Sequence, residues 1–317
     1  MMLIQNIWQK KKCGEFSADV IGNFAGIGIY LTKDIEKNAV IVISPIKDTP
    51  AHKAGILPGD IITKVDDVTY TGEQLTEASN KIKGEIGTTV KLEILRDGKM
   101  LTFEVKRENI KVNHVEGKVI DNTTIGYIEF NTFDEGCSDE FKTKFEELKA
   151  KNITSLIIDI RNNGGGLVNE ALDIVDFIVD KDSTVLITTD KNGNEEITKA
   201  EEDPIINMPI IVLTNKSTAS ASEILAGALK DNKKATIVGE TTYGKGVIQE
   251  LLTLVDGSGL KITTNEYFTP NRNKINKVGI TPDVEVKLDE KLEELLVVEE
   301  KDDNQLQKAI EMMKVTR

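Results

Sequence analysis

Three serines lie close together where a short apolar segment gives way to an alanine-rich one. The segment NKSTASASEILAGAL, residues 215–229, follows the apolar run IIVLTN and has the spacing of a helix. A serine at such a strand-to-helix turn is exposed, and the unpaired amides of the helix start can stabilise an anion formed there. The Ser220-Ala-Ser-Glu223 pattern also fits a capping box, in which the serine only closes the helix. Taken alone, this pattern favours the cap over a nucleophile.

A nucleophilic serine needs a base beside it, and the sequence offers few candidates. The chain contains two histidines, His52 and His114, and neither has an acidic partner in a recognisable arrangement. We therefore do not expect a Ser-His-Asp triad. The remaining base of suitable strength is a lysine. Its ordinary pKa of about 10.4 has to be lowered by burial before the amine can accept a proton at neutral pH.

Lys245 is the lysine that fits this requirement. It lies in GETTYGKGVIQE, residues 239–250, where glycines flank it, a buried strand precedes it and an alternating strand follows. Side chains repeat every two residues along a strand, so Lys245 and Gln249 are expected on the same side. Gln249 could then hold the amine by a hydrogen bond without adding charge.

The same stretch partly matches a phosphate-binding P-loop. Gly239 and Gly244-Lys245 have the required spacing, but Gly246 stands where a magnesium-binding serine or threonine belongs. A P-loop lysine also begins a helix, whereas the following residues predict a strand and a hairpin. Nucleotide binding is therefore not expected.

A glycine run is the third element with chemical potential. Asn162-Asn163-Gly164-Gly165-Gly166 directly follows the apolar strand SLIIDIR. By itself this run predicts a flexible turn, yet glycines here also allow backbone amides to approach a substrate, as in an oxyanion hole. Ligands of open α/β sheets bind at the carboxyl ends of the strands. If the two strands are parallel, the glycine run and the serine segment lie on the same side.

Composition and charge exclude several classes of function. With 317 residues, 39% hydrophobic and 29% charged, the chain has the composition of a soluble globular protein with room for two domains. A net charge of −13 argues against nucleic acid or an anionic membrane as partner. No stretch approaches the ~20 apolar residues of a membrane span. Cys13 and Cys137 could form one disulfide, but without CxxC spacing they predict neither a zinc site nor a redox motif. No metal and no cofactor are expected.

The order of predicted elements divides the chain into a β-rich module and an α/β part. In the module, strands are predicted at 24–31 and 39–46, two strand pieces around an Asp-Asp turn at 61–70, and a hairpin across Asp97-Gly98 at 88–107. The predicted helices lie at 50–56 and 74–84. Beyond an expected linker at 108–124, buried strands alternate with helices, which predicts a layered α/β core. Near the end, 306–314 is expected to pack as a helix on the core and 299–304 to be a solvated charge run. The predicted domains are 1–18, 19–107, 108–286 and 287–317.

Seven motifs in order connect these features. They are FAGIGI, PAHKAGILPGDIITKVD, DIRNNGGG, NKSTASASEILAGALKD, GETTYGKGVIQ, ITTNEYFTP and VGITPDVEV. This series, from about residue 20 to 286, resembles the carboxyl-terminal processing proteases, which are tail-specific serine proteases with an embedded PDZ domain. The resemblance implies a layered α/β protease core of the ClpP/crotonase-like type with an inserted β-rich PDZ domain.

The resemblance also implies a Ser-Lys dyad assisted by a glutamine. The family's nucleophile is the first serine of the Ser-Ala-Ser-Glu run, here Ser220. The lysine of its Tyr-Gly-Lys-Gly motif falls on Lys245, and the glutamine four residues later falls on Gln249. The implied oxyanion hole uses the amides of Ala221 and of one glycine, Gly165 or Gly166.

For the PDZ domain, the expected role is capture of a peptide carboxyl terminus. Such a domain adds the peptide as an extra strand and holds its carboxylate with backbone amides. The carboxylate loop falls on Ala25, Gly26, Ile27 and Gly28. Ile27 and Ile29 are expected to line the side-chain pocket. The family uses this domain as a gate, which makes Arg96 a candidate gate contact, although the sequence favours a solvated turn arginine.

The resulting hypothesis is a serine endopeptidase that recognises unstructured, apolar protein C-termini through a gating PDZ domain. The alternatives are a non-catalytic PDZ scaffold with a degenerate core and an acyl-thioester enzyme, against which the embedded PDZ module argues. The expected partner is a substrate C-terminus, with a homodimer and a regulatory protein at the PDZ gate left open. The family implies an extracytoplasmic location, in the cell envelope or secreted. Residues 1–12 do not resemble a signal peptide, which leaves a cytoplasmic location or a missing export segment as the alternatives.

Overall fold

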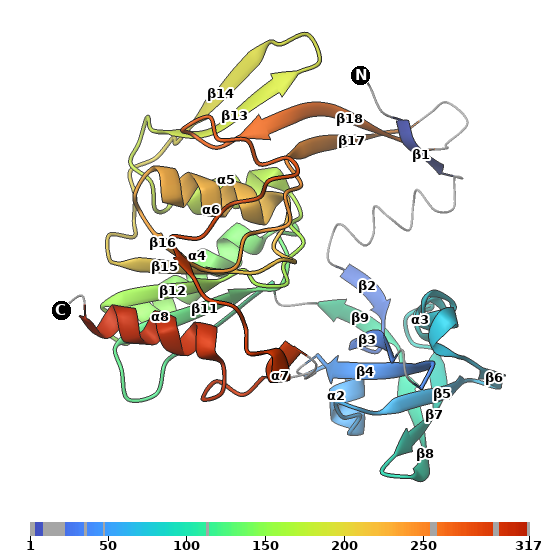
Figure 1. Ribbon diagram of the computed structural model, residues 1–317. Helices are drawn as coiled ribbons and strands as arrows, with labels where there is room; N and C mark the ends of the chain where they lie inside the picture. Colours follow the sequence, from blue (N-terminus) through green and yellow to red (C-terminus); the bar gives the residue numbers. More distant parts are fainter. Residues whose placement is uncertain are drawn as a thin grey trace. The chain divides into compact units, whose positions relative to one another are not determined.

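The computed structural model describes residues 4–8, 23–34, 37–46, 48–111, 114–253, 259–293 and 298–315. The chain forms two compact units (Figure 1). One comprises 22–112 with 294–298, and the other comprises 1–21, 113–293 and 299–317. Of the predicted N-terminal segment 1–18, the structure describes β1 (Ile4–Trp8), which belongs to the second unit. The first unit is therefore inserted into the second.

The inserted unit is built around an antiparallel sheet. Its strands follow the order β3-β4-β5-β7-β8, and β6 pairs with β5. They are β3 (Ile29–Asp34), β4 (Ala39–Pro45), β5 (Ile61–Val65), β6 (Val68–Thr69), β7 (Thr89–Arg96) and β8 (Lys99–Lys106). The helices α2 (Pro50–Ala54) and α3 (Leu75–Ile82) and the 3-10 turn η1 (Gly72–Gln74) lie between strands. Alternate residues of β4 and β7 form the core, namely Val40 and Val42 in β4 and Val90, Leu92 and Ile94 in β7, as expected for a sheet with one buried face.

Residues 108–124 do not form the expected linker. β9 (Glu108–Lys111) pairs antiparallel with β2 (Asn23–Gly26), which extends the inserted unit beyond Arg107. β10 (Val115–Val119) pairs antiparallel with β11 (Ile125–Phe130) in the other unit. The linker prediction is wrong because both strands have exposed faces rich in charged and polar residues, which hide their strand character in the sequence.

The second unit contains a largely parallel sheet in the order β10-β11-β12-β15-β16-β19. β12 (Ser155–Asp159) and β15 (Ile210–Thr214) are buried at every position, and β16 (Thr236–Gly239) and β19 (Val284–Glu285) continue the sheet. β11, β12, β15, β16 and β19 all run parallel to one another, and β10 pairs antiparallel with β11. The continuous apolar runs predicted that β12 and β15 are fully buried strands, and the structure confirms this.

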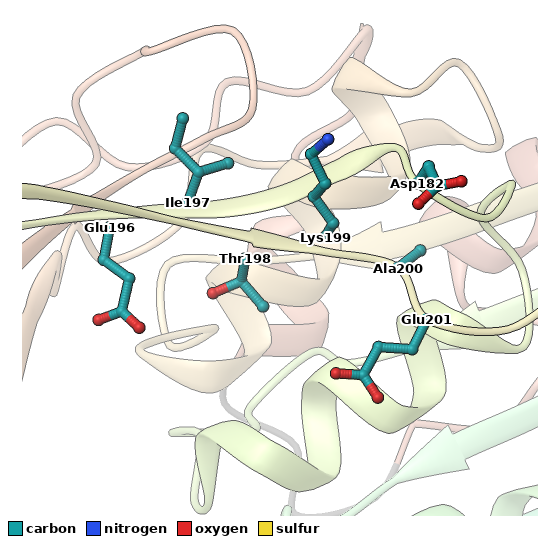
Figure 2. Close-up of a pocket in the computed structure, with 7 residues that line it drawn as sticks. All are labelled: Asp182, Glu196, Ile197, Thr198, Lys199, Ala200 and Glu201. Atoms are coloured by element: carbon teal, nitrogen blue, oxygen red, sulfur yellow. The ribbon is translucent and has the colours of Figure 1, made fainter.

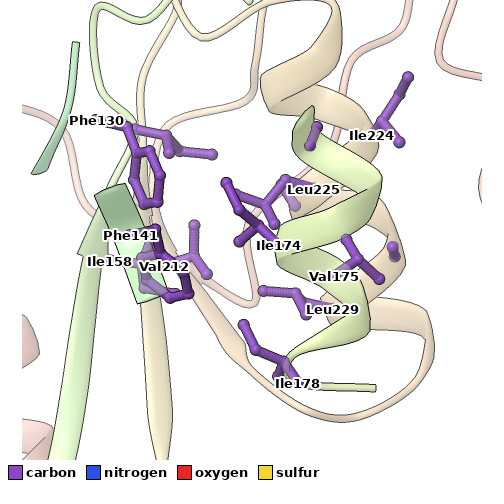
Figure 3. Close-up of a cluster of buried hydrophobic side chains, with 14 of the residues drawn as sticks. Phe130, Phe141, Ile158, Ile174, Val175, Ile178, Val212, Ile224, Leu225 and Leu229 are labelled. Atoms are coloured by element: carbon purple, nitrogen blue, oxygen red, sulfur yellow. The ribbon is translucent and has the colours of Figure 1, made fainter. Parts of the chain in front are cut away.

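Helices cover both faces of this sheet. α4 (Cys137–Lys149), α5 (Val168–Asp176) and α6 (Ala221–Asp231) pack on one face, where Ile158 and Val212 join their side chains (Figure 3). The adjacent residues in these two strands, Ile157, Ile211 and Leu213, point to the opposite face of the sheet. On that face they pack against α8 (Asn304–Val315). The layered α/β arrangement and the packing of the last helix are therefore confirmed.

A second sheet in this unit is organised around the long strand β18 (Gly259–Phe268). β18 pairs with β17 (Val247–Thr253) in the predicted hairpin, with β1, and with β13 (Thr184–Asp190), which in turn pairs with β14 (Glu195–Lys199). The short helix α7 (Glu290–Glu293) lies near the end of the chain. Within the part of the chain that the structure describes, no helix is both long and apolar enough to cross a membrane.

The predicted charge run 299–304 is not entirely solvated. Asp303 is buried, and its carboxylate pairs with the Arg161 guanidinium, with 2.7 Å between Nη2 and Oδ2. The backbone amide of Leu306 also donates to the Asp303 carboxylate, which therefore caps the start of α8. The prediction was wrong at this residue because its partner is distant in the sequence and a buried charge is tolerated only when paired.

Candidate active site

Two loops meet at the carboxyl ends of β12 and β15. These strands are direct parallel neighbours. This is the arrangement needed for the glycine run and the serine segment to lie on the same side of the sheet. The loop after β12 carries the glycine run, and the loop after β15 carries the serines. Two hydrogen bonds between Asn162 and Asn215 link the two loops. The backbone N–H of Asn162 donates to Asn215 Oδ1 at 3.0 Å, and the side-chain Nδ2 of Asn215 donates to Asn162 Oδ1 at 2.8 Å.

The structure distinguishes the three serines. Ser222 is fully buried, and its hydroxyl donates to the Asn163 carbonyl at 3.0 Å. Ser217 is exposed in the turn before the helix. Ser220 is partly buried and directly precedes α6, with φ 60° and ψ −119°. For a residue other than glycine this conformation costs on the order of 1–3 kcal/mol, a strain typical of functional sites.

The glycine run touches Ser220 directly. A Cβ atom on Gly165 would lie 2.7 Å from Ser220 Cβ and 2.9 Å from the Ala221 nitrogen, so only glycine fits here. The Gly165 amide donates to Asn163 Oδ1 at 2.8 Å. Asn163 is itself buried, and its carbonyl accepts the Ala219 amide at 3.0 Å. One buried asparagine thus fixes the glycine run against the serine segment.

The loop that carries Lys245 packs against the same serine segment. The Tyr243 amide donates to the Thr218 carbonyl at 2.9 Å, two residues before Ser220. On its other side the loop is held by Lys277, whose amide donates to the Gly244 carbonyl at 2.7 Å. Lys245 itself is partly buried. The structure therefore brings the predicted nucleophile and the predicted base into adjoining loops.

Glu223 joins these loops, a role that the sequence did not reveal. Its buried carboxylate accepts the Ser220 amide at 2.9 Å, which is the backbone half of the predicted capping box. It also accepts the Thr242 hydroxyl at 2.5 Å and the amides of Gly244 and Lys245 at 2.8 and 2.9 Å. The capping pattern could identify the first of these contacts, because both residues belong to one helix start. The others depend on a distant loop.

Tyr267 is a second site residue that sequence analysis missed. It lies on β18, is 1% exposed, and its hydroxyl is 3.0 Å from the Ser220 carbonyl and within hydrogen-bond distance of the Lys245 carbonyl. Burial raises the pKa of the Tyr267 phenol, and the Glu223 carboxylate raises it further, so the phenol remains a donor. The ITTNEYFTP motif contains this tyrosine, but the motif alone gives no reason to assign it a contact.

Gln249 lies in β17, and its backbone pairs with Thr263. The register of the hairpin shifts between Ile248 and Gln249, which interrupts the simple two-residue alternation on which the prediction rested. The side chain of Gln249 lies outside the part of the chain that the structure describes. Its contact with Lys245 therefore stays a prediction.

The two histidines lie in different surroundings. His52 is exposed on α2 in the inserted unit. His114 is buried, with Nδ1 3.5 Å from Glu140 Oε2 and Nε2 3.9 Å from Asp134 Oδ2. Among the described residues, no group of three or more His, Cys, Asp or Glu side chains is placed to hold a metal ion.

In the inserted unit, the predicted carboxylate loop leads from β2 into β3. Ile27 is 1% exposed and belongs to the core of this unit, whereas Ile29 is only partly buried at the start of β3. Gly28 has φ 78°, and a Cβ atom there would lie 2.4 Å from Thr49 Cβ. Ala25 is partly buried and Gly26 is buried. Of the two isoleucines, Ile29 is the one with surface left to contact a ligand.

Arg96 is not a solvated turn residue. Its guanidinium donates to both carboxylate oxygens of the buried Asp60, at 2.6 and 2.7 Å, and to the Gly55 carbonyl at 2.8 Å. The same group lies over the Phe103 ring, 5.5 Å from the ring centre. These contacts hold the end of α2 to the β7–β8 hairpin, and the role of Arg96 as a gate contact stays a prediction.

A surface hollow follows the outer strand β14 (Figure 2). Along this strand, Ile197 and Lys199 point to one side and Glu196 and Thr198 to the other. The residues that line it include none of the predicted catalytic residues. This hollow therefore gives no support for a second candidate active site.

Comparison with known proteins identifies both units. The model of peptidase family S41 matches residues 124–286, and the model of the PDZ domain matches residues 25–106. The probable CtpA-like serine protease of Staphylococcus haemolyticus (strain JCSC1435) is 37% identical over 280 residues, which cover 87% of this chain and 55% of that protein. The carboxy-terminal processing protease CtpB of Bacillus subtilis (strain 168) is 36% identical over 282 residues, which cover 88% of this chain and 58% of that protein.

A solved structure is similar over almost the whole chain. The photosystem II D1 C-terminal processing protease aligns with a TM-score of 0.59 and 31% identity, covering 95% of this chain and 82% of that one. This similarity includes both the α/β core and the inserted PDZ domain that the sequence predicted. The chain spans little more than half the length of the two curated relatives described above.

Proposed function

Because the chain belongs to peptidase family S41, a family of serine-type peptidases, and carries a PDZ domain, we propose that it is an endopeptidase acting on protein C-termini. One observation carries this proposal. A partly buried serine in a strained conformation at a helix start shares its backbone hydrogen-bond partners, Glu223 and Tyr267, with Lys245. The relatives named as carboxy-terminal processing proteases support the same chemistry.

In the proposed reaction, Ser220 attacks the carbonyl carbon of the scissile peptide bond. Neutral Lys245 accepts the hydroxyl proton as the Oγ–C bond forms, and then donates it to the leaving amine as the C–N bond breaks. A water molecule hydrolyses the resulting ester, and Lys245 again accepts and returns a proton. Gln249 is proposed to position the amine, as the family resemblance implies.

The oxyanion of the tetrahedral intermediates needs donors beside Ser220. The Ala221 amide is the first, since it directly follows the nucleophile and begins α6. For the second we propose the amide of Gly166, because the Gly165 amide already donates to Asn163. Gly165 then serves to let the backbone approach Ser220.

Substrate recognition is proposed to use both units. In the inserted unit, β3 has β4 as its neighbour on one side, and α3 contacts it, so a peptide could add along its other edge with its carboxylate at the loop 25–28. Beside the Lys245 loop, Tyr243 and Val278 are 68% and 57% exposed. Both are apolar and lie next to Gly244, whose added Cβ would be 2.9 Å from the Val278 nitrogen. They are suited to contact apolar substrate side chains.

Alanine variants of the dyad test the proposal. Ser220→Ala and Lys245→Ala should each reduce hydrolysis of casein, or of a peptide with an apolar C-terminus, by at least about a thousandfold. A fluorophosphonate probe should label the wild-type serine and not the Ser220→Ala variant. Undiminished cleavage by either variant would reject the assignment, and a C-terminal peptide that binds but is never cut would favour a non-catalytic scaffold.

Two solution measurements separate this chemistry from others. The rate should rise toward alkaline pH, because a lysine acts as base only in its neutral form. It should be unchanged by EDTA, whereas loss of activity on chelation would indicate a metal-dependent reaction. An extracytoplasmic location, a homodimer and a regulator of the PDZ gate remain proposals that rest on the family.

A further inference from the structure

Two side chains contact the backbones of both Ser220 and Lys245, although these residues are 25 positions apart. The amides of both residues donate to the same carboxylate oxygen, Glu223 Oε2, at 2.9 Å each. The carbonyls of both residues face the same phenol, the hydroxyl of Tyr267. The two N–H groups are therefore held by one carboxylate, and the two C=O groups lie within reach of the single O–H proton of Tyr267.

We propose that Glu223 and Tyr267 form a clamp that sets the position of the Lys245 amine relative to the Ser220 hydroxyl. This inference rests on the proposed function, because the clamp has a catalytic consequence only if these residues react as a dyad. Glu223 and Tyr267 are positioning residues in this account: they touch the backbones that carry the reacting groups and do not themselves exchange protons with the substrate.

Positioning matters here because the two groups come from separate loops. A general base has to lie within about 3.2 Å of the proton that it removes. A displacement of about 1 Å between reacting groups can cost about a hundredfold in rate. Lys245 is flanked by Gly244 and Gly246, which add little conformational restriction of their own. The restriction has to come from contacts with the rest of the fold.

The chemistry of Glu223 suits it to this role. An ionised carboxylate only accepts hydrogen bonds and offers about four acceptor positions, and the structure supplies four donors from Ser220, Thr242, Gly244 and Lys245. The Thr242 hydroxyl also accepts the Ile280 amide at 2.7 Å, so its proton is directed to Glu223. A glutamine at this position would present an NH₂ group to some of these donors and leave amides unpaired.

The chain offers a matched control for Tyr267. Tyr127 is also a buried tyrosine of the same unit, and its hydroxyl donates to Asp159 Oδ2 at 2.8 Å. It packs among the residues on the α8 side of the parallel sheet. Replacing either tyrosine with phenylalanine removes one buried hydroxyl, but only the change at Tyr267 removes contacts with the backbones of Ser220 and Lys245.

The experiment compares Tyr267→Phe, Glu223→Gln and Tyr127→Phe in the full chain. With a peptide substrate, Tyr267→Phe should lower kcat about tenfold and Glu223→Gln about a hundredfold, while KM stays within about twofold. Tyr127→Phe should leave both constants unchanged. Thermal unfolding followed by circular dichroism reports any general loss of stability. The fall in kcat of the double variant Tyr267→Phe/Glu223→Gln should be smaller than the product of the two single effects. The reason is that both changes remove contacts with the same two backbones, those of Ser220 and Lys245.

Thr242→Val and Thr242→Ser provide a rescue test of the Glu223 contact. Valine matches the shape of threonine without its hydroxyl, so it should lower kcat, and serine should restore most of the loss. A Tyr267→Phe or Glu223→Gln variant with wild-type kcat would overturn the proposal. The proposal would also be overturned if Tyr127→Phe lowered kcat as much as Tyr267→Phe does, with an equal loss of stability.

Hydrogen exchange tests the clamp independently of activity. Amides of residues 240–246 should exchange faster in Tyr267→Phe and Glu223→Gln than in the wild type and Tyr127→Phe. If the wild-type chain cleaves nothing, the proposed function fails, and this measurement still decides whether the clamp exists. Unchanged exchange in both variants would reject the clamp even if the protease were active.

Discussion

The two regions proposed to bind substrate are held in place by different means. Around Ser220, buried polar side chains such as Asn163, Glu223 and Tyr267 bond to the backbone of neighbouring loops. In the inserted unit, the loop 25–28 is held mainly by backbone bonds, among them the Ala51 amide to the Ile27 carbonyl at 2.9 Å.

The difference suits the two tasks that we propose for these regions. Proton transfer requires groups on separate loops to be held within a fraction of an ångström, and side chains can bridge loops that the backbone ladder does not join. Capture of a peptide strand requires a strand edge whose N–H and C=O groups remain available, so side-chain bridges there would occupy the site. The following substitutions test this contrast, from the largest expected effect to the smallest.

Gly165→Ala should be the most damaging change at the serine site. The new Cβ would lie 2.7 Å from Ser220 Cβ at a φ of 101°, so the serine or the glycine run has to move. We expect kcat to fall by at least about a hundredfold, measured with a short peptide substrate. Gly164→Ala is the control, because a Cβ there meets nothing within 4 Å. Equal effects of both changes would contradict the close approach seen at Gly165.

Gly28→Ala makes the corresponding change in the inserted unit. The new Cβ would lie 2.4–2.6 Å from the Thr49 side chain at a φ of 78°, which should distort the loop 25–28. We expect KM for a substrate with a free apolar C-terminus to rise about tenfold, with kcat for the same substrate changed far less. For a C-terminally amidated substrate, Gly28→Ala should leave KM unchanged. If kcat fell as much as KM rose, the separation of tasks would be incorrect.

Tyr243→Ala removes an exposed side chain beside the Lys245 loop while leaving its backbone bond to Thr218 available. We expect KM to rise about fivefold for substrates with apolar residues near the cleaved bond and to change little for polar ones. Steady-state kinetics with the two substrate types measures this difference. Ile205→Ala, which also removes an exposed apolar side chain, should have no such effect.

Arg96→Ala should affect stability and leave the rate of a short peptide unchanged. The substitution leaves Asp60, which is 1% exposed, without its charged partner. Chemical unfolding should report a loss of about 1–3 kcal/mol in the inserted unit. Arg272→Ala is the control, because its pair with Glu195 is exposed on both sides and should contribute little. A change in the rate of short-peptide hydrolysis would instead support Arg96 as a gate contact.

Some features were predictable because they depend on residues close in the chain. Alternating apolar residues predicted the hairpin of β7 and β8, and continuous apolar runs predicted the buried strands β12 and β15. The order of motifs predicted the family and the inserted PDZ domain, which the comparisons confirm. The strands β9 and β10 were missed because their exposed charged residues resemble a linker.

What the sequence determined by itself was the division into an α/β core and an inserted β-rich domain, together with the short segments that contain Ser220, Lys245 and the glycines. Local pattern suffices for these, because each is specified within about ten residues. Only the tertiary structure decided how deeply each of the three serines is buried, and that Glu223 and Tyr267 contact the backbones of both Ser220 and Lys245. These contacts join residues up to 47 positions apart, and they form only after the strands and helices have packed.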